Sequence, residues 1–165
     1  MLHIVYGGSA SGKSSYAESF AMSLQGEGRL LYIATMYPYK WNTTEIDPET
    51  MQRIERHRAM RADKGFDTVE CYRHVEHIVA KRQDVLLLEC MSNLLANEMY
   101  LEPDSNAGSD MAETMSPVSN KIVQALIDLS TRVQELVIVT NDVFSDGGSL
   151  TYDESTREYV KNLAE

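Results

Sequence analysis

Cysteine and long apolar runs are both scarce in this sequence. Cys71 and Cys90 are the only cysteines, and neither has the spacing of a paired metal ligand, so we expect reduced thiols in a cytoplasmic protein. The longest apolar run, "VLLLE", is far too short to span a bilayer. No signal peptide is expected, because "MLHIVYGG" passes from the first residue directly into a strand.

Positive charge is also in deficit. The chain has 15 Lys and Arg against 25 Asp and Glu, which gives a formal net charge of −10. Such a balance argues against non-specific binding to nucleic acid or to an anionic membrane surface. Any anion must therefore be held by a local cluster of groups rather than by the overall field of the protein.

The length and composition indicate one globular domain covering residues 1–165. Hydrophobic residues make up 43% of the 165 residues, which suffices for a core, and we find no internal repeat and no domain boundary. Short apolar runs alternate with helical patterns. The predicted strands are 2–6, 30–35, 67–71, 84–90 and 135–141, and the predicted helices begin after residue 14 and at 48, 73, 92, 118 and 153.

This alternation predicts an α/β fold, with a mostly parallel sheet covered by helices on both faces. Asp47 and Pro48 are suited to the N-cap and the first turn of the helix that ends near Arg61. The segments 36–46, 101–117 and 142–152 are predicted to be irregular. The histidines of the polar helix expected over 73–82, His74 and His77, are spaced for a metal pair but lack a third ligand.

The stretch "GGSASGKS", residues 7–14, fits the pattern G-x-x-x-x-G-K-[ST] between a strand and a helix. The glycines allow a tight turn whose N–H groups surround a phosphate. Lys13 adds a full positive charge, and the Ser14 hydroxyl can ligate a magnesium ion that bridges the phosphates. The alternative is a chance glycine–serine turn, but the flanking strand and helix favour nucleotide phosphate binding.

A phosphate-binding loop of this kind needs an acid at the end of another buried strand. Glu89 and Asp142 both follow apolar runs, and carboxyl ends of parallel strands form the ligand-binding edge of an open sheet. We favour Glu89 as the group near magnesium. The alternative is that Glu89 caps the helix that begins near Ser92.

The segment "RIERHRAMR", residues 53–61, surrounds His57 with four arginines. Arg53, His57 and Arg61 are spaced i, i+4 and i+8, so they share one stripe of a helix. The positive field lowers the pKa of the imidazole, and a neutral imidazole can attack phosphorus. The other interpretation is a solvated basic helix with an incidental histidine, and the residues alone favour that second interpretation.

Taken together, these segments resemble the bifunctional adenosylcobinamide kinase and adenosylcobinamide-phosphate guanylyltransferase family of cobalamin biosynthesis. The resemblance spans nearly the whole chain. It rests on "GGSASGKSSYAE", "LLYIAT", "RIERHR", "TVE" before Cys71, "VLLLECMSNLLANEM" and "VIVTNDV".

The resemblance implies a P-loop domain similar to the RecA-type core, assembled as a homotrimer. It implies two reactions: a nucleoside triphosphate, GTP or ATP, phosphorylates adenosylcobinamide, and GMP is then transferred from GTP through a covalent histidine–GMP intermediate. The family histidine matches His57, and Lys13 is the P-loop lysine. The implied nucleotide contacts are Gly7, Gly8, Ser9, Ala10, Ser11, Gly12, Lys13, Ser14, Thr35, Met36, Tyr37, Arg58, Ala59, Met60, Arg61, Glu70 and Glu89, with Ser14 and Glu89 at Mg²⁺.

Three features depart from the family pattern. The loop "YPYKWNTTEIDPE", residues 37–49, is longer and more aromatic, and Phe66 stands where a tryptophan is expected. The family continues into a final strand after the last helix, so the sheet is expected to lack one edge strand. Two other readings stay open: a P-loop small-molecule kinase without guanylyl transfer, and a non-catalytic nucleotide-binding module.

Overall fold

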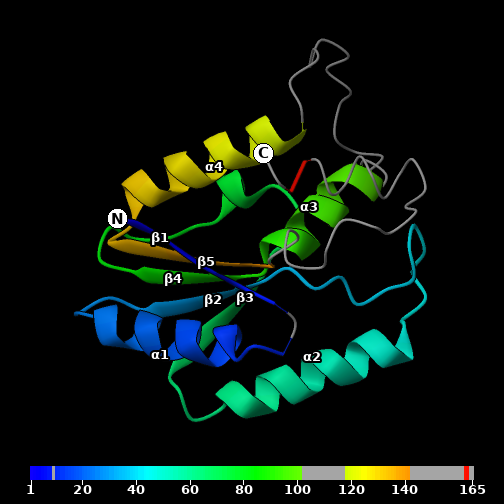
Figure 1. Cartoon of the computed structure of the whole chain (residues 1–165), viewed down its shortest axis with the longest axis horizontal. Helices are drawn as coiled ribbons and strands as arrows, with labels where there is room; N and C mark the ends of the chain where they lie inside the picture. Colours follow the sequence, from blue (N-terminus) through cyan, green and yellow to red (C-terminus); the bar gives the residue numbers. More distant parts are fainter. Residues whose placement is uncertain (9, 102–117, 142–161, 164–165) are drawn as a thin grey trace.

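A computed structural model of the chain describes residues 1–8, 10–101, 118–141 and 162–163. Strands and helices alternate along most of it (Figure 1). In chain order the elements are β1 (Leu2–Gly7), α1 (Lys13–Leu24), β2 (Leu30–Ala34), α2 (Pro48–Arg61), β3 (Phe66–Glu70), the short 3-10 turn η1 (Val75–His77), β4 (Val85–Glu89), α3 (Met91–Tyr100), α4 (Val118–Arg132) and β5 (Glu135–Asn141).

The described strands form one parallel sheet in the order β1-β5-β4-β2-β3. β2 and β4 lie in its interior, and four of the five residues of each are buried. Burial on both faces explains why these two strands read as continuous apolar runs instead of alternating ones. The α/β P-loop fold expected from the sequence is confirmed.

Helices cover both faces of the sheet (Figure 1). On one face, Ala17 and Ala21 of α1 pack on β2, β4 and β5 with no exposed surface of their own. On the other face, α3, α4 and η1 bury a larger cluster that includes Leu94 and Leu129. The small alanine side chains let α1 approach the sheet closely, and this fixes the helix that begins at the glycine loop.

The helix predicted over 73–82 is wrong. Apart from the turn η1, residues 73–82 are not helical. His74 has a φ of 56°, which is left-handed and incompatible with a continuing helix. Its backbone N–H instead donates to Glu98 Oε1 of α3 at 2.7 Å, while Val75 and Ile78 are buried in the core. A tertiary hydrogen bond and burial thus override the local helical pattern.

The other predicted elements match the structure where it describes them. Asp47 is the N-cap residue of α2 and Pro48 its first residue, as expected. Most of the segments 101–117 and 142–152, and of the helix expected from 153, fall outside the described residues. Strand β1 lies at an edge of the sheet, so the missing edge strand stays a prediction, as does the single domain over 1–165.

Two further observations concern membrane-spanning helices and metal sites. Among the described residues no helix has the length and apolar character needed to cross a membrane. Nor do three His, Cys, Asp or Glu side chains gather as metal ligands anywhere in that part of the chain. His74 and His77 do lie together, with ring centroids 5.6 Å apart, but the third ligand is absent from the described residues around them.

Candidate nucleotide site

A cavity of about 370 Å³ opens at the carboxyl end of the sheet. Its wall combines the start of α1, the ends of β2, β3 and β4, and one side of α2. It therefore lies where ligands bind in open parallel sheets. The lining residues are Ala10, Lys13, Ser14, Tyr32, Ala34, Met36, Arg53, Ile54, His57, Arg58, Arg61, Glu70, Tyr72, Glu89, Cys90, Ser92, Asn93 and Asn141.

The glycine loop joins β1 to α1 by a tight turn. Gly12 has a φ of +83°, a conformation that costs glycine little and other residues much more. A Cβ on Gly7 would come within 2.9 Å of Ser11 Oγ, so the loop closes on itself there. Lys13 begins α1, and its Nζ donates to the Gly8 carbonyl at 3.1 Å. The N-terminus of α1 and the lysine ammonium thus both bring positive charge to the cavity.

Ser14 and Glu89 come together although 75 residues separate them. The Ser14 hydroxyl donates to Glu89 Oε1 at 2.5 Å, while the buried Glu89 Oε2 has no hydrogen-bond partner. Burial is the largest influence on Glu89 and raises its pKa, against the lowering effects of Ser14 and Lys13. A hydroxyl beside a buried, under-satisfied carboxylate is a donor set of the hard oxygen type that suits Mg²⁺.

The alternative role of Glu89 as a helix cap is wrong. The N-cap position of α3 is Cys90, and no side chain caps that end. The Glu89 carboxylate is instead held by Ser14, on the side of the sheet where α1 begins. The other candidate acid, Asp142, lies outside the described residues.

Helix α2 brings His57 to the same cavity as Lys13 and Ser14. Arg53 and Arg61 line it as well, so the predicted stripe of arginine, histidine and arginine faces inward. Partial burial, and then the positive charges of Arg61, Arg53 and Arg56, lower the pKa of His57 from its usual value, although Glu18 acts in the opposite sense. The imidazole is therefore neutral at neutral pH, the form that can act as a nucleophile.

Arg61 is buried, with only 5% of its surface exposed, although it carries a full charge. Its guanidinium carbon lies 3.4 Å from the centroid of the Tyr32 ring, and its Nε and Nη1 atoms have no hydrogen-bond partner. Buried, unsatisfied guanidinium donors are costly unless an acceptor reaches them. An anion in the cavity would supply that acceptor.

The sequence matches a protein family whose description agrees with a nucleotide-binding cavity. The sequence profile described as "Cobinamide kinase / cobinamide phosphate guanyltransferase" matches residues 3–165. The chain belongs to this family.

Two curated relatives agree with the match. The chain is 31% identical over 151 residues to the "Bifunctional adenosylcobalamin biosynthesis protein CobU" of Escherichia coli strain K12, covering 87% of this chain and 76% of the relative. It is likewise 31% identical over 150 residues to the protein of the same name from Salmonella typhimurium strain LT2, with the same two coverages.

The structure places the predicted site residues of this cobinamide kinase family member in several parts of the molecule. Ala10, Lys13, Ser14, Met36, Arg58, Arg61, Glu70 and Glu89 line the cavity with His57, while Gly7, Ser11 and Gly12 line a shallow groove on the other side of the loop. Thr35 is buried and exchanges hydrogen bonds with the Cys90 backbone, and Ala59 and Met60 are exposed on α2. Tyr37 lines a neighbouring hollow, and Ser9 lies outside the described residues.

The mouth of the cavity is formed by a contact that the sequence did not predict. Arg58 of α2 and Glu70 at the end of β3 form an ion pair, and the Tyr72 hydroxyl donates to the other Glu70 oxygen at 2.8 Å. Burial, followed by the hydrogen bond with Glu70, raises the pKa of Tyr72, so it stays a neutral donor. This linked set places the two predicted nucleotide contacts at the rim.

Sequence reasoning missed several other lining residues. Tyr32 lies inside a predicted strand and only its contact with Arg61 reveals its place. Asn141 is the last residue of β5 and its amide donates to Ser92 Oγ at 2.9 Å. The available signal for Asn141 was a polar residue at the end of a buried strand, next to the candidate acid Asp142.

Asn97 of α3 is a buried polar residue that ties the cavity walls together. Its amide nitrogen donates to the Thr35 carbonyl at 2.8 Å and to the Tyr72 carbonyl at 2.9 Å. These carbonyls follow β2 and β3, so one side chain joins the segments after both strands. No motif or spacing in the sequence singles out Asn97.

Proposed function

We propose that the chain phosphorylates the hydroxyl of adenosylcobinamide and then transfers GMP from GTP to the phosphate so formed, with His57 carrying the GMP between the two partners. The observation that supports this most directly is that His57 lines the same cavity as Lys13 and Ser14 of the glycine loop. A triphosphate held by the loop would thus have an unprotonated imidazole within the same space.

In the kinase reaction the acceptor hydroxyl oxygen forms a bond to the γ-phosphorus of GTP or ATP and loses its proton to solvent. The bond to the β-phosphate oxygen breaks, so that GDP or ADP leaves. Charge on the transferred group is stabilised by loop N–H groups and by Lys13. Arg61 contributes unsatisfied donors on the opposite wall. These groups position the phosphates and need no covalent role.

In the guanylyl reaction a ring nitrogen of His57 forms a bond to the α-phosphorus of GTP, and pyrophosphate leaves. A phosphate oxygen of the acceptor then forms a bond to that phosphorus, and the histidine is released. Splitting the transfer into two displacements gives each step an in-line nucleophile. Arg53, Arg58 and Arg61 line the cavity around the histidine and suit the anionic substrate.

Magnesium fits the pair Ser14 and Glu89, because one Glu89 oxygen is buried without a partner and the other accepts the serine hydroxyl. When bound, Mg²⁺ neutralises charge on the phosphates. The homotrimer and the cytoplasmic location implied by the sequence stay predictions, and sedimentation of the purified protein tests the first of these.

Labelled GTP tests the covalent step without any acceptor. The protein is incubated with Mg²⁺ and GTP labelled at the α-phosphorus, then denatured, and protein-bound label is measured. We expect an acid-labile, alkali-stable adduct that His57→Ala abolishes and His77→Ala, a matched histidine outside the cavity, leaves intact. Label that persists in His57→Ala would remove His57 from this role.

The alternative of a kinase without guanylyl transfer predicts a different result. It requires phosphorylation of cobinamide with no protein-bound label under the same conditions. A nucleotide-binding module without catalysis predicts GTP binding with neither product. The inward-facing arginine and histidine stripe of α2 favours the two-step enzyme, because neither alternative requires it.

A further inference from the structure

Five aromatic side chains form a connected surface beside the nucleotide cavity. We call Tyr37, Tyr39, Trp41, Tyr72 and Tyr100 the aromatic shelf. The Tyr37 ring centroid lies 5.4 Å from that of Tyr39, 6.3 Å from that of Trp41 and 5.4 Å from that of Tyr72. Trp41 in turn meets Tyr100 at the end of α3, with centroids 6.2 Å apart.

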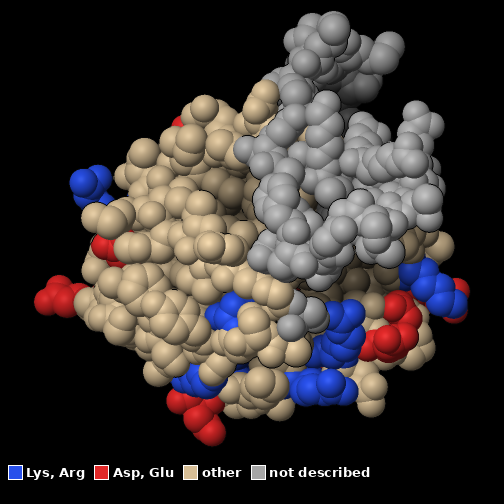
Figure 2. Space-filling model, viewed as in Figure 1, with Lys and Arg blue, Asp and Glu red and all other residues tan. Residues whose placement is uncertain are grey.

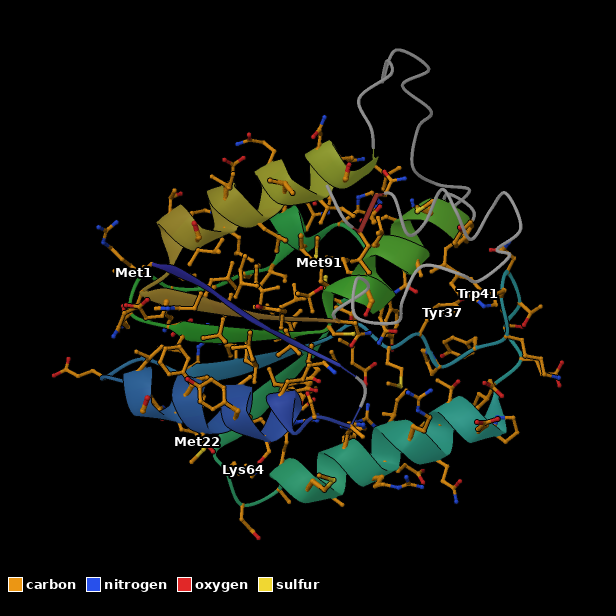
Figure 3. The ribbon with its side chains drawn as sticks, in the orientation of Figure 1. Met1, Met22, Tyr37, Trp41, Lys64 and Met91 are labelled. Carbon is orange, nitrogen blue, oxygen red and sulfur yellow. The ribbon has the colours of Figure 1, made fainter. Side chains whose placement is uncertain are left out.

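The shelf draws on three parts of the chain that are distant in sequence. Tyr37 and Trp41 lie between α2 and α3 at one end of the molecule (Figure 3), and their ring contacts with Tyr72 and Tyr100 join this loop to the segment after β3 and to α3. The loop between β2 and α2 is held in a hairpin-like form by a bridge between Tyr39 and Ile46. The aromatic loop is therefore a folded part of the surface.

Part of the shelf is exposed to solvent. Trp41 is 51% exposed and Tyr39 is 38% exposed, whereas Leu87 and Leu88 in the sheet are fully buried. Neighbouring Ile46 is also 52% exposed. Large aromatic side chains gathered at a surface, rather than scattered singly, are typical of a site that binds an apolar partner.

The shelf adjoins both the cavity and a second, wider hollow of about 1320 Å³. Glu70 and Tyr72 line the cavity and the hollow alike, and Tyr37 lines the hollow. The two spaces therefore share a wall at Glu70 and Tyr72. A ligand seated in the hollow could extend a short arm past these two residues toward the phosphates.

The rest of the hollow is mixed: Val69, Ile78, Val79 and Leu101 add apolar surface, and other residues supply hydrogen-bonding side chains. Asn42, Thr43, Thr44, His74 and His77 line it with Tyr37 and Tyr72. A surface that combines flat aromatic rings with amide, hydroxyl and imidazole groups suits a ligand that has a broad apolar ring and amide substituents. It suits a simple hydrocarbon or a polyanion much less well.

We propose that the aromatic shelf and its hollow bind the corrin macrocycle of the cobinamide acceptor, with the aminopropanol arm directed past Glu70 and Tyr72 into the nucleotide cavity. This inference rests on the proposed function, because it assigns a place to that function's acceptor. The macrocycle is a broad ring bearing amide side chains, far larger than the space that holds the phosphates. Another hollow at the same rim, lined by Tyr39, Arg58 and Tyr72 among others, has a volume of only about 140 Å³ and is too small for the macrocycle.

Steady-state kinetics with each substrate varied in turn test the shelf. Trp41→Ala and Tyr39→Ala are each expected to raise KM for cobinamide about tenfold, because each substitution removes an aromatic contact with the macrocycle. KM for GTP and formation of the labelled GMP adduct should not change. Trp41→Phe should restore most of the affinity, and Met22→Ala, an exposed apolar residue on α1, is the matched control.

Calorimetric titration of the protein with dicyanocobinamide gives a second measurement, independent of turnover. Binding should weaken in Trp41→Ala to about the same extent as KM rises. If neither KM for cobinamide nor the calorimetric affinity changes in Trp41→Ala and Tyr39→Ala, the shelf is not the acceptor site. Failure of the proposed function is distinct, because it would appear as absence of the GMP adduct in the unmodified protein.

Discussion

The two helices that flank the nucleotide cavity are attached to the protein in different ways. Helix α1 places Ala17, Glu18 and Ala21 in the interior, against the buried strands. Helix α2, whose residues are all described, has Arg61 as its one buried side chain, and its apolar residues Met51 and Ile54 are only partly buried. Several Lys and Arg side chains lie over α2 on the face shown in Figure 2.

The proposed phosphate-binding loop and the proposed nucleophile His57 therefore lie on elements that are attached to the core in different ways. The phosphate loop is fixed by β1 and by a helix that is part of the core, so its geometry is set when the protein folds. The helix with His57 has fewer contacts with the core: Arg61 lies on Tyr32, Arg58 pairs with Glu70, and no apolar side chain of α2 is fully buried. We therefore expect substitutions on the α1 side and on the α2 side to affect activity and stability differently.

Lys13→Ala should give the largest effect. Loss of the ammonium removes a full charge from the phosphate site, and we expect both reactions to slow by at least about 100-fold. Thermal stability should be nearly unchanged, since the lysine bonds only the partly exposed Gly8 carbonyl. Turnover assays and thermal melts check this, with Lys81→Ala as a control at the opposite end of the sheet; normal turnover in Lys13→Ala would contradict the phosphate role of the loop.

Arg61→Met should reduce GMP adduct formation by about tenfold through loss of one charged hydrogen-bonding group. Stability should be unchanged or slightly higher. The contact with Tyr32 is worth about 0.5–2 kcal/mol, but unsatisfied buried donors cost about 1–3 kcal/mol each, and methionine restores apolar packing.

Adduct measurements and urea unfolding of the same samples check both parts of this prediction. Arg56→Met is the matched control, because Arg56 is exposed on α2 and does not line the cavity. A marked loss of stability in Arg61→Met alone would contradict this prediction. It would show that the contact with Tyr32 anchors α2, so that α2, like α1, contributes to the stability of the fold.

The pH dependence of adduct formation should show the smallest effect. Because the pKa of His57 is lowered, the rate should rise with pH through a value below the ordinary pKa of histidine and stay level above it. Arg53→Gln removes one of the charges that lower this pKa, so the acid limb should move to higher pH. Because Arg53 also lines the cavity, the position of the limb, and not the height of the plateau, is the quantity compared. Single-turnover rates across the acid range check this; an unmoved limb would mean that the charge on Arg53 does not reach the histidine.

The sequence predicted most of the fold because the relevant signals are local. Apolar runs such as "VLLLE" can only be buried strands in a chain of this composition, and the glycine loop has its own pattern. The helix predicted at 73–82 failed because its backbone follows a hydrogen bond from His74 to Glu98, 24 residues away. No local pattern encodes such a bond.

The candidate site was likewise predictable from the sequence only in part. Lys13, Ser14 and His57 could be named from their motifs, and the structure brings all three to one cavity. Two contacts could not be predicted from the sequence: that of Arg61 with Tyr32, and the rim formed by Arg58, Glu70 and Tyr72. Both depend on how α2 lies across the ends of the strands. The aromatic loop was visible in the sequence as a departure from the family, but its partners Tyr72 and Tyr100 were not.

The double hydrogen bond of Asn97 couples the nucleotide cavity to the aromatic shelf mechanically. The Asn97 amide donates to the Thr35 carbonyl, at the start of the aromatic loop, and to the Tyr72 carbonyl after β3. Movement of either segment alone would therefore break one of these hydrogen bonds and leave that carbonyl without its Asn97 donor. The two bonds therefore hold the segments that follow β2 and β3 at a set distance from each other. If the shelf binds the corrin ring as proposed, the same bonds would set the spacing between the ring and the triphosphate.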